Sequence, residues 1–175
     1  MVVFYSDMIR QIKVPCQMDF MWLSSYSGTN STGELIVRRD VSVDIKDRHV
    51  LILEDIYDTG TSLDFTYRHL MSKGPASLKI CTLLDKPERR KPGITLKPDY
   101  VGFTIPNEFV VGYGLDYNEH FRNLPYVGVL KPKPRAVLEE IVISMPETMP
   151  KPAMPQRAPE RIIVRMMTFF VLIPA

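Results

Sequence analysis

The chain has 175 residues, with 22 Lys and Arg against 20 Asp and Glu, and 45% of its residues are hydrophobic. This composition fits a globular domain with a sizeable core and excludes a disordered, solvated tail. A net charge of +2 gives no field of the size that a polyanion requires, so charge alone does not suggest nucleic acid. Any phosphate site must therefore be local.

The cysteines and the two ends of the chain predict a cellular location. Cys16 and Cys81 lie in apolar runs, and neither their number nor their spacing suggests a disulfide framework or a zinc site, so we expect buried free thiols in a reducing compartment. The N-terminal residues include Asp7 and lack the continuous apolar run of a secretory signal. The apolar run at 166–175 is shorter than the ~20 residues that a membrane span needs. We expect a cytoplasmic protein without a membrane partner.

The predicted elements alternate between helices and strands. Apolar residues recur at helical spacing over residues 4–12, and residues 16–23 have the pattern of a strand. Residues 50–53 form a short, wholly apolar run that is typical of a central parallel strand. A helix is predicted over residues 61–74, where a glycine marks its end, and residues 78–84 supply the next strand.

This order of elements predicts the fold class. Strand, helix and strand form a right-handed βαβ unit, and short strands at 100–103 and 126–130 are expected to extend the sheet. The expected fold is α/β, with an open, mostly parallel sheet and flanking helices. Its ligand should lie beyond the carboxyl ends of the strands.

Proline changes the character of the chain after Leu130, since eight of the 15 prolines lie beyond it. We expect a domain over residues 1–130, a Pro-rich linker over 131–160 with at most one short element at 136–143, and an apolar segment over 161–175. Three interpretations of the last segment stay open. It could pair as a strand of the sheet, bind a partner or aggregate, or reflect a misread gene end.

The most informative stretch is VLILEDIYDTGTS, residues 50–62. It places Glu54, Asp55 and Asp58 between a buried strand and a helix N-terminus. Residues 59–62 can turn backbone N–H groups and hydroxyls toward one point, where the helix dipole also favours an anion. Carboxylates accept hydrogen bonds, which suits sugar hydroxyls or metal-bound water. An acidic turn that caps a helix is the alternative, but the whole ordered set favours a sugar-phosphate site.

This stretch resembles the signature with which type I phosphoribosyltransferases bind 5-phosphoribosyl-1-pyrophosphate. Other segments narrow the resemblance to the hypoxanthine-guanine (6-oxopurine) branch, and the similarity covers roughly residues 4–131. The segments that carry it are SSYSGTNSTGE (24–34), VDIKDRHVLILED (43–55), LLDKPERR (83–90) and FVVGYGLDYNEHFRNLPYVGVL (109–130). Family members normally carry a further helix, a first core strand and a Lys-Gly loop before such a start, so the resemblance implies that the domain is N-terminally incomplete.

The resemblance implies an activity and two alternatives to it. The activity is transfer of the 5-phosphoribosyl group to hypoxanthine or guanine in purine salvage, which gives IMP or GMP and pyrophosphate. A non-catalytic protein that binds nucleotides or sugar phosphates is one alternative, and an inactive truncated product is the other. The implied partners are the purine base and 5-phosphoribosyl-1-pyrophosphate, with Mg²⁺ as cofactor, no nucleic acid, and a homo-oligomer (dimer or tetramer).

The family pattern also implies roles for single residues. Asp58 matches the catalytic carboxylate near purine N7, Glu54 and Asp55 match the partners of the ribose hydroxyls, and Lys86 matches the donor to the purine 6-oxo group. The residues implied to hold the 5-phosphate are Thr59, Gly60, Thr61 and Ser62.

Further matches lie in the second half of the chain. Phe109 resembles the aromatic residue that stacks on the purine, and Val110 offers backbone hydrogen bonds. Asp116, together with the two acids of the strand, Glu54 and Asp55, resembles the Mg²⁺ site, and Arg122 resembles the cation that neutralises pyrophosphate. A core phenylalanine and ordinary surface ions are the alternatives.

Two more features complete the implied site. Ser25 and Tyr26 match a pair on a mobile loop that closes over the site and keeps water from an oxocarbenium-like state. Arg89 and Arg90 could form a basic contact patch, and Arg90 aligns with an arginine on the pyrophosphate side of the family's site; a solvated loop is the alternative for both.

Overall fold

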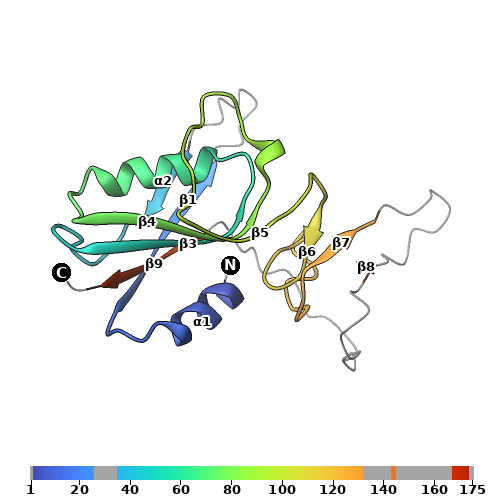
Figure 1. Cartoon of the computed structure of the whole chain (residues 1–175), viewed down its shortest axis with the longest axis horizontal. Helices are drawn as coiled ribbons and strands as arrows, with labels where there is room; N and C mark the ends of the chain where they lie inside the picture. The colour runs from blue at the N-terminus through green and yellow to red at the C-terminus, as the bar shows by residue number, and fades with distance from the viewer. Residues whose placement is uncertain (1, 26–34, 132–142, 145–166, 174–175) are drawn as a thin grey trace. The chain divides into compact units, whose positions relative to one another are not determined.

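The structure is a computed structural model, and it describes residues 2–25, 35–131, 143–144 and 167–173 (Figure 1). The predicted mobile loop beyond Ser25 lies outside these residues, as does nearly all of the predicted Pro-rich linker. Within the described ranges, neither α-helix has the length and apolar character that crossing a membrane would require.

The chain forms two compact units. The first contains residues Met1–Asn107 and Arg165–Ala175, and the second contains Glu108–Val164. A six-stranded sheet belongs to the first unit and a three-stranded sheet to the second. The two ends of the chain therefore share the first unit.

The six-stranded sheet combines a parallel and an antiparallel half. Strands β3, β4 and β5 pair in parallel, whereas the β2–β1, β1–β9 and β9–β3 pairs are antiparallel. The order across the sheet is β2 (Leu35–Arg39), β1 (Gln17–Ser25), β9 (Met167–Ile173), β3 (His49–Tyr57), β4 (Ser77–Asp85) and β5 (Tyr100–Thr104). This open sheet with flanking helices confirms the predicted α/β fold class, and its parallel pairs are β3–β4 and β4–β5. The sheet is mixed because β9 runs antiparallel to both of its neighbours.

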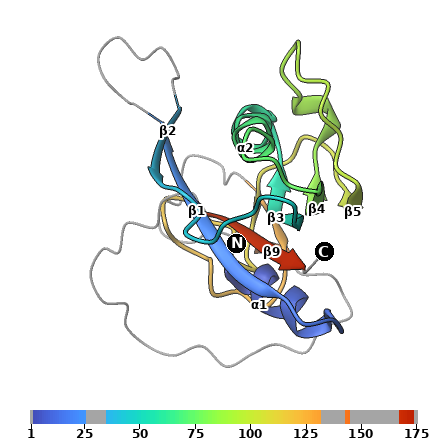
Figure 2. The ribbon, with the colours of Figure 1, turned by 90° about the vertical axis from the view of Figure 1, so that its left-hand side faces the viewer.

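The C-terminal strand β9 lies between β1 and β3, which are both distant from it in the sequence (Figure 2). Leu172 is paired with Gln17 on one side and with Val50 on the other. Val171 and Leu172 are fully buried. Of the three interpretations of the C-terminal segment, the structure shows the strand.

Two α-helices flank the sheet on opposite faces, α1 (Val2–Gln11) on one and α2 (Thr61–Met71) on the other (Figures 1 and 2). Helix α2 carries Asp64 in its first turn and Arg68 in its last, an order that complements the helix dipole. Gly74 follows the helix in a left-handed conformation, with φ of 71°, and its N–H donates to the carbonyl of Met71 at 3.1 Å. The predicted helix and its glycine stop are confirmed.

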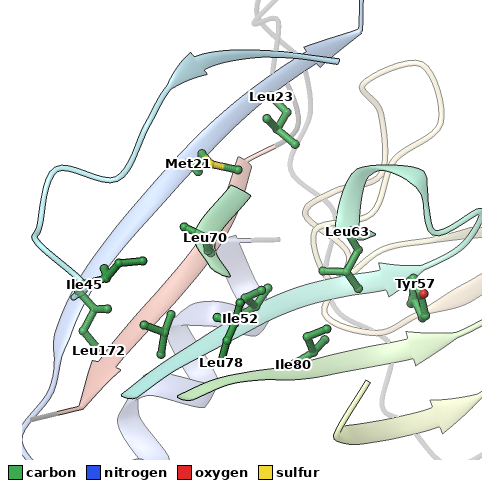
Figure 3. Close-up of a cluster of buried hydrophobic side chains, with 11 residues drawn as sticks. Met21, Leu23, Ile45, Ile52, Tyr57, Leu63, Leu70, Leu78, Ile80 and Leu172 are labelled. Carbon is green, nitrogen blue, oxygen red and sulfur yellow. The ribbon is translucent and has the colours of Figure 1, made fainter. Parts of the chain in front are cut away.

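The main core fills the space between α2 and the sheet (Figure 3). Its buried side chains come from both halves of the sheet, from α2 and from the segment before β3, and they are Met21, Leu23, Ile45, Val50, Ile52, Tyr57, Leu63, Leu70, Leu78, Ile80 and Leu172. Burying one such aliphatic side chain stabilises the fold by ~1.5–3 kcal/mol. The packing of α2 fixes the direction in which its N-terminus points at the end of β3.

Two expectations from the sequence were wrong in detail. The strand expected at 126–130 does not extend the main sheet, because β7 (Gly128–Leu130) pairs with β6 (Val110–Val111) and β8 (Ile143–Ser144) in the second unit. Its apolar pattern predicts a strand but carries no information about which sheet the strand joins. Cys16 is partly exposed rather than buried, since it precedes β1 instead of lying within it.

Candidate active site

The loop between β3 and α2 is tightly packed around Gly60. This glycine has φ of 87°, a left-handed conformation that other residues rarely adopt. A Cβ atom here would lie 2.8 Å from Ile94 Cγ2 and 3.0 Å from Arg90 Cδ. Both conformation and space therefore require glycine, and the chain can turn sharply from the strand into the helix.

The N-terminus of α2 is open to an anion. The residue at the N-cap position is Gly60, which has no side chain to cap the first N–H groups of the helix. The Thr61 hydroxyl is buried and has no hydrogen-bond partner among the residues that the structure describes. Uncapped N–H groups, the positive end of the helix dipole and an unsatisfied hydroxyl together suit a phosphate. Thr59, Gly60, Thr61 and Ser62 thus have the local geometry that a phosphate cradle needs.

Two acids lie near the carboxyl end of β3, where parallel α/β sheets bind their ligands. Glu54 is buried and Asp55 is partly exposed. Both residues interact within the fold, which offsets the cost of burying a carboxylate. They precede the phosphate cradle by a few residues of chain, as a sugar between its hydroxyls and its 5-phosphate would require.

Asp58 is held by two consecutive arginines. Arg89 Nε donates to Asp58 Oδ1 at 3.1 Å, and Arg90 Nη1 donates to the Asp58 carbonyl at 2.6 Å. Arg90 also forms an ion pair with Asp85, and its guanidinium carbon lies 3.2 Å from the centre of the Tyr57 ring. The Asp58 carboxylate remains 37% exposed and is accessible to a ligand.

The Tyr57 side chain anchors the start of this loop in the core. Its hydroxyl donates to the carbonyl of Leu96 at 2.8 Å. Burial raises the pKa of this hydroxyl, and the Arg90 cation opposes that rise only in part. The ring therefore offers Arg90 a neutral, fixed aromatic face.

Lys86 lies beside this loop at the end of β4. Its backbone N–H donates to the carbonyl of Tyr57 at 3.0 Å, which ties the ends of β3 and β4 together. Its side chain is buried and interacts within the fold. The backbone N–H of Lys91 donates to the Thr59 carbonyl at 3.0 Å and adds a second tie. The first unit thus brings the acids, Asp58, the phosphate cradle and Lys86 to one edge of its sheet.

The second unit presents an exposed aromatic side chain. Phe109 is 52% exposed, and its ring meets Tyr117 edge to face, with the two centroids 5.7 Å apart. The Phe109 carbonyl accepts from the N–H of Leu130 at 2.7 Å, while the side chain of Val110 is buried in β6. A ring that is exposed on one side and fixed by a neighbour is suited to stacking on a planar ligand.

Asp116 and Arg122, which were expected to act on Mg²⁺ and pyrophosphate, pair with each other at 2.9 Å. Arg122 Nη1 also donates to the Gly114 carbonyl at 2.9 Å, and its buried Nε has no partner among the described residues. Tyr113 has φ of 52° between two glycines that also have positive φ. Such backbone strain is common at functional sites. The pair is therefore part of a constrained loop with an unused donor.

The predicted Mg²⁺ site can be tested against these residues. No group of three or more His, Cys, Asp or Glu side chains converges to hold a metal ion in the part of the chain that the structure describes. Mg²⁺ prefers oxygen ligands and is commonly held by one or two carboxylates together with substrate phosphates. Glu54 and Asp55 fit that arrangement, with the remaining ligands coming from a bound pyrophosphate and water.

Sequence reasoning left three parts of the site unassigned or open. Tyr26 of the predicted lid lies outside the described residues, and Ser25 is the last residue of β1. The roles of Asp85 and Tyr57 were missed, because their contacts with Arg90 depend on folding rather than on a motif. The alternative of a solvated loop for Arg90 was wrong, since its side chain is only 16% exposed.

Comparison with known proteins agrees with this geometry. The family model described as a phosphoribosyl transferase domain matches residues 2–118. A hypoxanthine-guanine phosphoribosyltransferase from Lactococcus lactis is 54% identical over 133 residues, which are 75% of this chain and 71% of that protein.

Solved structures show the same relationship. The crystal structure of a hypoxanthine phosphoribosyltransferase from Staphylococcus aureus is 52% identical, with a TM-score of 0.69 over 75% of this chain and 71% of that one. The Trypanosoma cruzi hypoxanthine phosphoribosyltransferase in complex with the product IMP is 42% identical, with a TM-score of 0.68 over 75% of this chain and 70% of that one. The resemblance drawn from the sequence is confirmed: the chain belongs to the phosphoribosyl transferase domain family, in its hypoxanthine-guanine phosphoribosyltransferase branch.

Proposed function

We propose that this protein transfers the 5-phosphoribosyl group of 5-phosphoribosyl-1-pyrophosphate to hypoxanthine or guanine, which gives IMP or GMP and pyrophosphate. The observation that carries the proposal is the N-terminus of α2, which follows the acids of β3 and has glycine at its N-cap position. Its buried Thr61 hydroxyl has no hydrogen-bond partner among the described residues. An uncapped helix and an orphan hydroxyl suit a phosphate, and the acids suit the sugar that bears it. The family match gives no support to the alternative of a non-catalytic binding protein.

The sugar phosphate would bind along the β3–α2 loop. Glu54 and Asp55 would accept hydrogen bonds from the ribose hydroxyls. The 5-phosphate would be held by the backbone and hydroxyl groups of Thr59, Gly60, Thr61 and Ser62. This arrangement leaves ribose C1, where the bond to pyrophosphate breaks and the bond to the base forms, on the side of Asp58.

The family pattern supports three residues, Lys86, Phe109 and Val110, for recognition of the purine. Lys86 would donate to the 6-oxo group, whose partial negative charge a cation stabilises. Phe109 would stack on the base, and Val110 would offer its backbone to the purine edge. Asp58 would hold or accept the N7 proton while a ring nitrogen attacks C1. These roles are supported by the position of Asp58 and Lys86 directly after β3 and β4 and by the exposed ring of Phe109.

The leaving pyrophosphate would be neutralised by Arg122, whose buried Nε is an unused donor in the described structure. Mg²⁺ would be held by Glu54 or Asp55 with oxygens of the substrate, and Asp116 offers a further carboxylate in the second unit. When bound, the ion offsets the charge that develops on pyrophosphate. The loop that begins with Ser25 and Tyr26 would close over the site and exclude water.

A turnover assay tests this proposal directly. Purified chain, 5-phosphoribosyl-1-pyrophosphate and Mg²⁺ are incubated with hypoxanthine or guanine, and formation of IMP or GMP is followed by absorbance. Calorimetric titration with IMP and GMP accompanies the assay. Turnover supports the proposal, whereas nucleotide binding without turnover would contradict it and support a non-catalytic binding protein.

We also propose a cytoplasmic homo-oligomer. The free thiols of Cys16 and Cys81 support a reducing compartment. Burial raises the pKa of the Cys81 thiol, which keeps it protonated and unreactive. Light scattering on the purified chain measures the oligomeric state, and a monomer at assay concentration would contradict this part of the proposal.

A further inference from the structure

We propose that Arg90 is a positioning residue that fixes the loop carrying Asp58 and the phosphate cradle against the end of β4, and that it does not bind pyrophosphate. This inference rests on the proposed function for the roles of Asp58 and the cradle. Its structural basis is a single guanidinium that joins three elements of the first unit.

The contacts of Arg90 converge from both strand ends. Its guanidinium carbon lies 3.2 Å from the centre of the Tyr57 ring, at the end of β3. One nitrogen donates to the Asp58 carbonyl at 2.6 Å, and the other pairs with Asp85 at the end of β4. The stem of the same side chain lies against Gly60, since Cδ is 3.0 Å from the position that a Cβ would occupy there. Arg90 therefore contacts the residue before Asp58, the backbone of Asp58 and the glycine of the cradle.

These contacts require arginine. A planar guanidinium can stack on an aromatic ring and donate in two directions within its plane at the same time. A lysine ammonium is a compact charge that could pair with Asp85 but could not also stack on the Tyr57 ring and donate to the Asp58 carbonyl. A hydrogen bond to the Asp58 carbonyl restricts the backbone from which its carboxylate projects.

The same contacts argue against a role in binding pyrophosphate. The Arg90 and Asp85 side chains are each 16% exposed, so the positive charge is neutralised in a partly closed environment. An incoming phosphate would have to displace Asp85, a carboxylate already paired with Arg90. Arg89 is different, because it is 46% exposed and contacts the Asp58 carboxylate rather than its backbone.

The inference assigns Arg90 to orientation, and misplacement of a reacting group by about 1 Å can lower the rate by ~100-fold. We therefore expect Arg90→Met, which keeps the length and the apolar stem, to lower kcat by ~10–100-fold. KM for 5-phosphoribosyl-1-pyrophosphate and product inhibition by pyrophosphate should stay within about threefold, since uniform binding is unchanged. Arg90→Lys should not restore kcat.

Asp85→Asn is the second variant, because it weakens the ion pair between Arg90 and Asp85 and leaves Arg90 in place. It should lower kcat in the same direction by a smaller factor. Arg68→Met is the matched control, since the Arg68 side chain is 74% exposed and pairs with Asp64 on α2 at 3.0 Å, and it should leave kcat unchanged.

Hydrogen exchange provides a readout that does not need activity. Amides of residues 57–62 should exchange faster in Arg90→Met than in the wild-type chain, and Arg68→Met should leave their exchange unchanged. A wild-type chain without turnover would contradict the proposed function alone, and the exchange comparison would still decide this inference.

Three results would overturn the assignment. One is a rise in KM for 5-phosphoribosyl-1-pyrophosphate, with weaker pyrophosphate inhibition, that Arg90→Lys reverses; this would identify Arg90 as a phosphate-binding cation. Another is full kcat in folded Arg90→Met. The third is unchanged exchange over residues 57–62 in both Arg90→Met and Asp85→Asn.

Discussion

The two halves of the six-stranded sheet differ in strand direction and in what their ends carry. In the parallel half, the ends of β3 and β4 carry Asp58, the phosphate cradle and Lys86 within one hydrogen-bonded cluster. In the antiparallel half, β9 fills the space between β1 and β3, and Asp19 of β1 is satisfied by backbone N–H groups. Neighbouring ends of antiparallel strands point in opposite directions, so only the parallel half can gather several strand ends at one edge.

This difference suggests a division between catalysis and stability. Substitutions in the antiparallel half should change the free energy of unfolding and leave kcat per folded molecule intact. Substitutions at the strand ends of the parallel half should change kcat or base selectivity with small effects on unfolding.

Deletion of residues 165–175 should abolish cooperative folding. The deletion removes β9 and leaves unpaired backbone on both β1 and β3. It also removes the fully buried Val171 and Leu172, each of which contributes ~1.5–3 kcal/mol. Thermal unfolding followed by circular dichroism measures the effect, and an unchanged melting temperature would contradict a structural role for β9.

A point substitution gives a graded form of the same test. Leu172→Ala should lower the free energy of unfolding by ~2–5 kcal/mol while kcat per folded molecule stays unchanged. Met18→Ala is the control, because Met18 is 58% exposed on neighbouring β1, and it should cost at most ~0.5 kcal/mol. Equal costs for the two variants would show that the burial of the Leu172 side chain does not contribute to stability.

Asp58→Asn should lower kcat by ~10²–10⁴-fold, because asparagine cannot accept the N7 proton. IMP binding and the melting temperature should change little, since the phosphate cradle is intact and the pair with Arg89 is exposed. Steady-state kinetics and calorimetry measure both. The matched control is Asp44→Asn, an exposed aspartate of the segment before β3, which should retain full kcat. Full turnover by Asp58→Asn would rule out the proposed proton-transfer role.

Lys86 should make the enzyme select 6-oxopurines over adenine. Adenine presents an amino donor where hypoxanthine presents an oxygen, so the lysine would face a donor. We expect kcat/KM for adenine to be lower than that for hypoxanthine by at least ~100-fold. Lys86→Gln should reduce the ratio by lowering the hypoxanthine value. Comparable kcat/KM for the two bases in the wild-type enzyme would refute the assignment.

The parallel half was largely predictable from the sequence. The central strand β3 contains the wholly apolar run 50–53. The EDIYDTGTS stretch that follows brings a turn, acidic side chains and hydroxyl groups together in one local segment. A local signal of this kind predicts the structure well because the residues of the segment are neighbours in the chain. Asp58 and residues 59–62 therefore lie in the expected turn before α2, whereas Glu54 and Asp55 lie within β3, which continues to Tyr57.

The antiparallel half and the contacts of Arg90 were not predictable in the same way. The apolar pattern of β9 permits a strand, but its place between β1 and β3 depends on pairing across most of the chain. The contact of Arg90 with the Asp58 carbonyl spans 32 residues. The sequence of a loop does not show whether an arginine in it is solvated or hydrogen-bonded within the fold. Contacts at that distance follow from the packed fold rather than from a motif.

Asp19→Asn should destabilise the fold by ~1.5–3 kcal/mol at neutral pH. Asp19 is buried, and one of its oxygens accepts from the N–H groups of Ser42 and Val43 at 2.6 and 3.0 Å. Burial raises the pKa of Asp19, but these hydrogen bonds, with a third from Phe20, outweigh burial and hold the pKa below its ordinary value of 3.8. The NH₂ group of an asparagine at this position would face backbone N–H donors and could not accept their hydrogen bonds.

The pH dependence of this effect has a definite sign. Because the folded pKa is depressed, the ionised carboxylate stabilises the fold above the unfolded pKa and loses that contribution as pH falls through the folded value. Urea unfolding at pH 7 and near pH 3 should therefore show a smaller difference between wild type and Asp19→Asn at the lower pH. A difference that does not change with pH would contradict a stabilising role for the ionised Asp19 carboxylate. A lower kcat of Asp19→Asn at pH 7 would contradict the division between the two halves.

The smallest effect is expected at Asp40, which joins the chain after β2 to helix α2. Its two oxygens accept from His69 Nε2 at 2.9 Å and from Lys73 Nζ at 2.7 Å. Burial raises the pKa of Asp40, but the hydrogen bonds from Lys73 and His69 outweigh it and lower the pKa. The three side chains are about a third exposed, so solvent screens them and Asp40→Asn should cost less than ~1 kcal/mol. Urea unfolding at low and high salt should show this cost shrinking as salt rises.

Helix α2 makes Asp40 a sensitive test of the division between the two halves. The helix receives the Asp40 contacts in its last turn and just beyond it, at His69 and Lys73, and begins at the phosphate cradle. If the core between α2 and the sheet fixes the helix, weakening these contacts should leave kcat and IMP affinity unchanged. Lys73→Gln, which removes only one partner, should give a smaller loss of stability than Asp40→Asn. A tenfold fall in kcat for Asp40→Asn, with the fold intact, would mean that the antiparallel half sets the orientation of the cradle through α2.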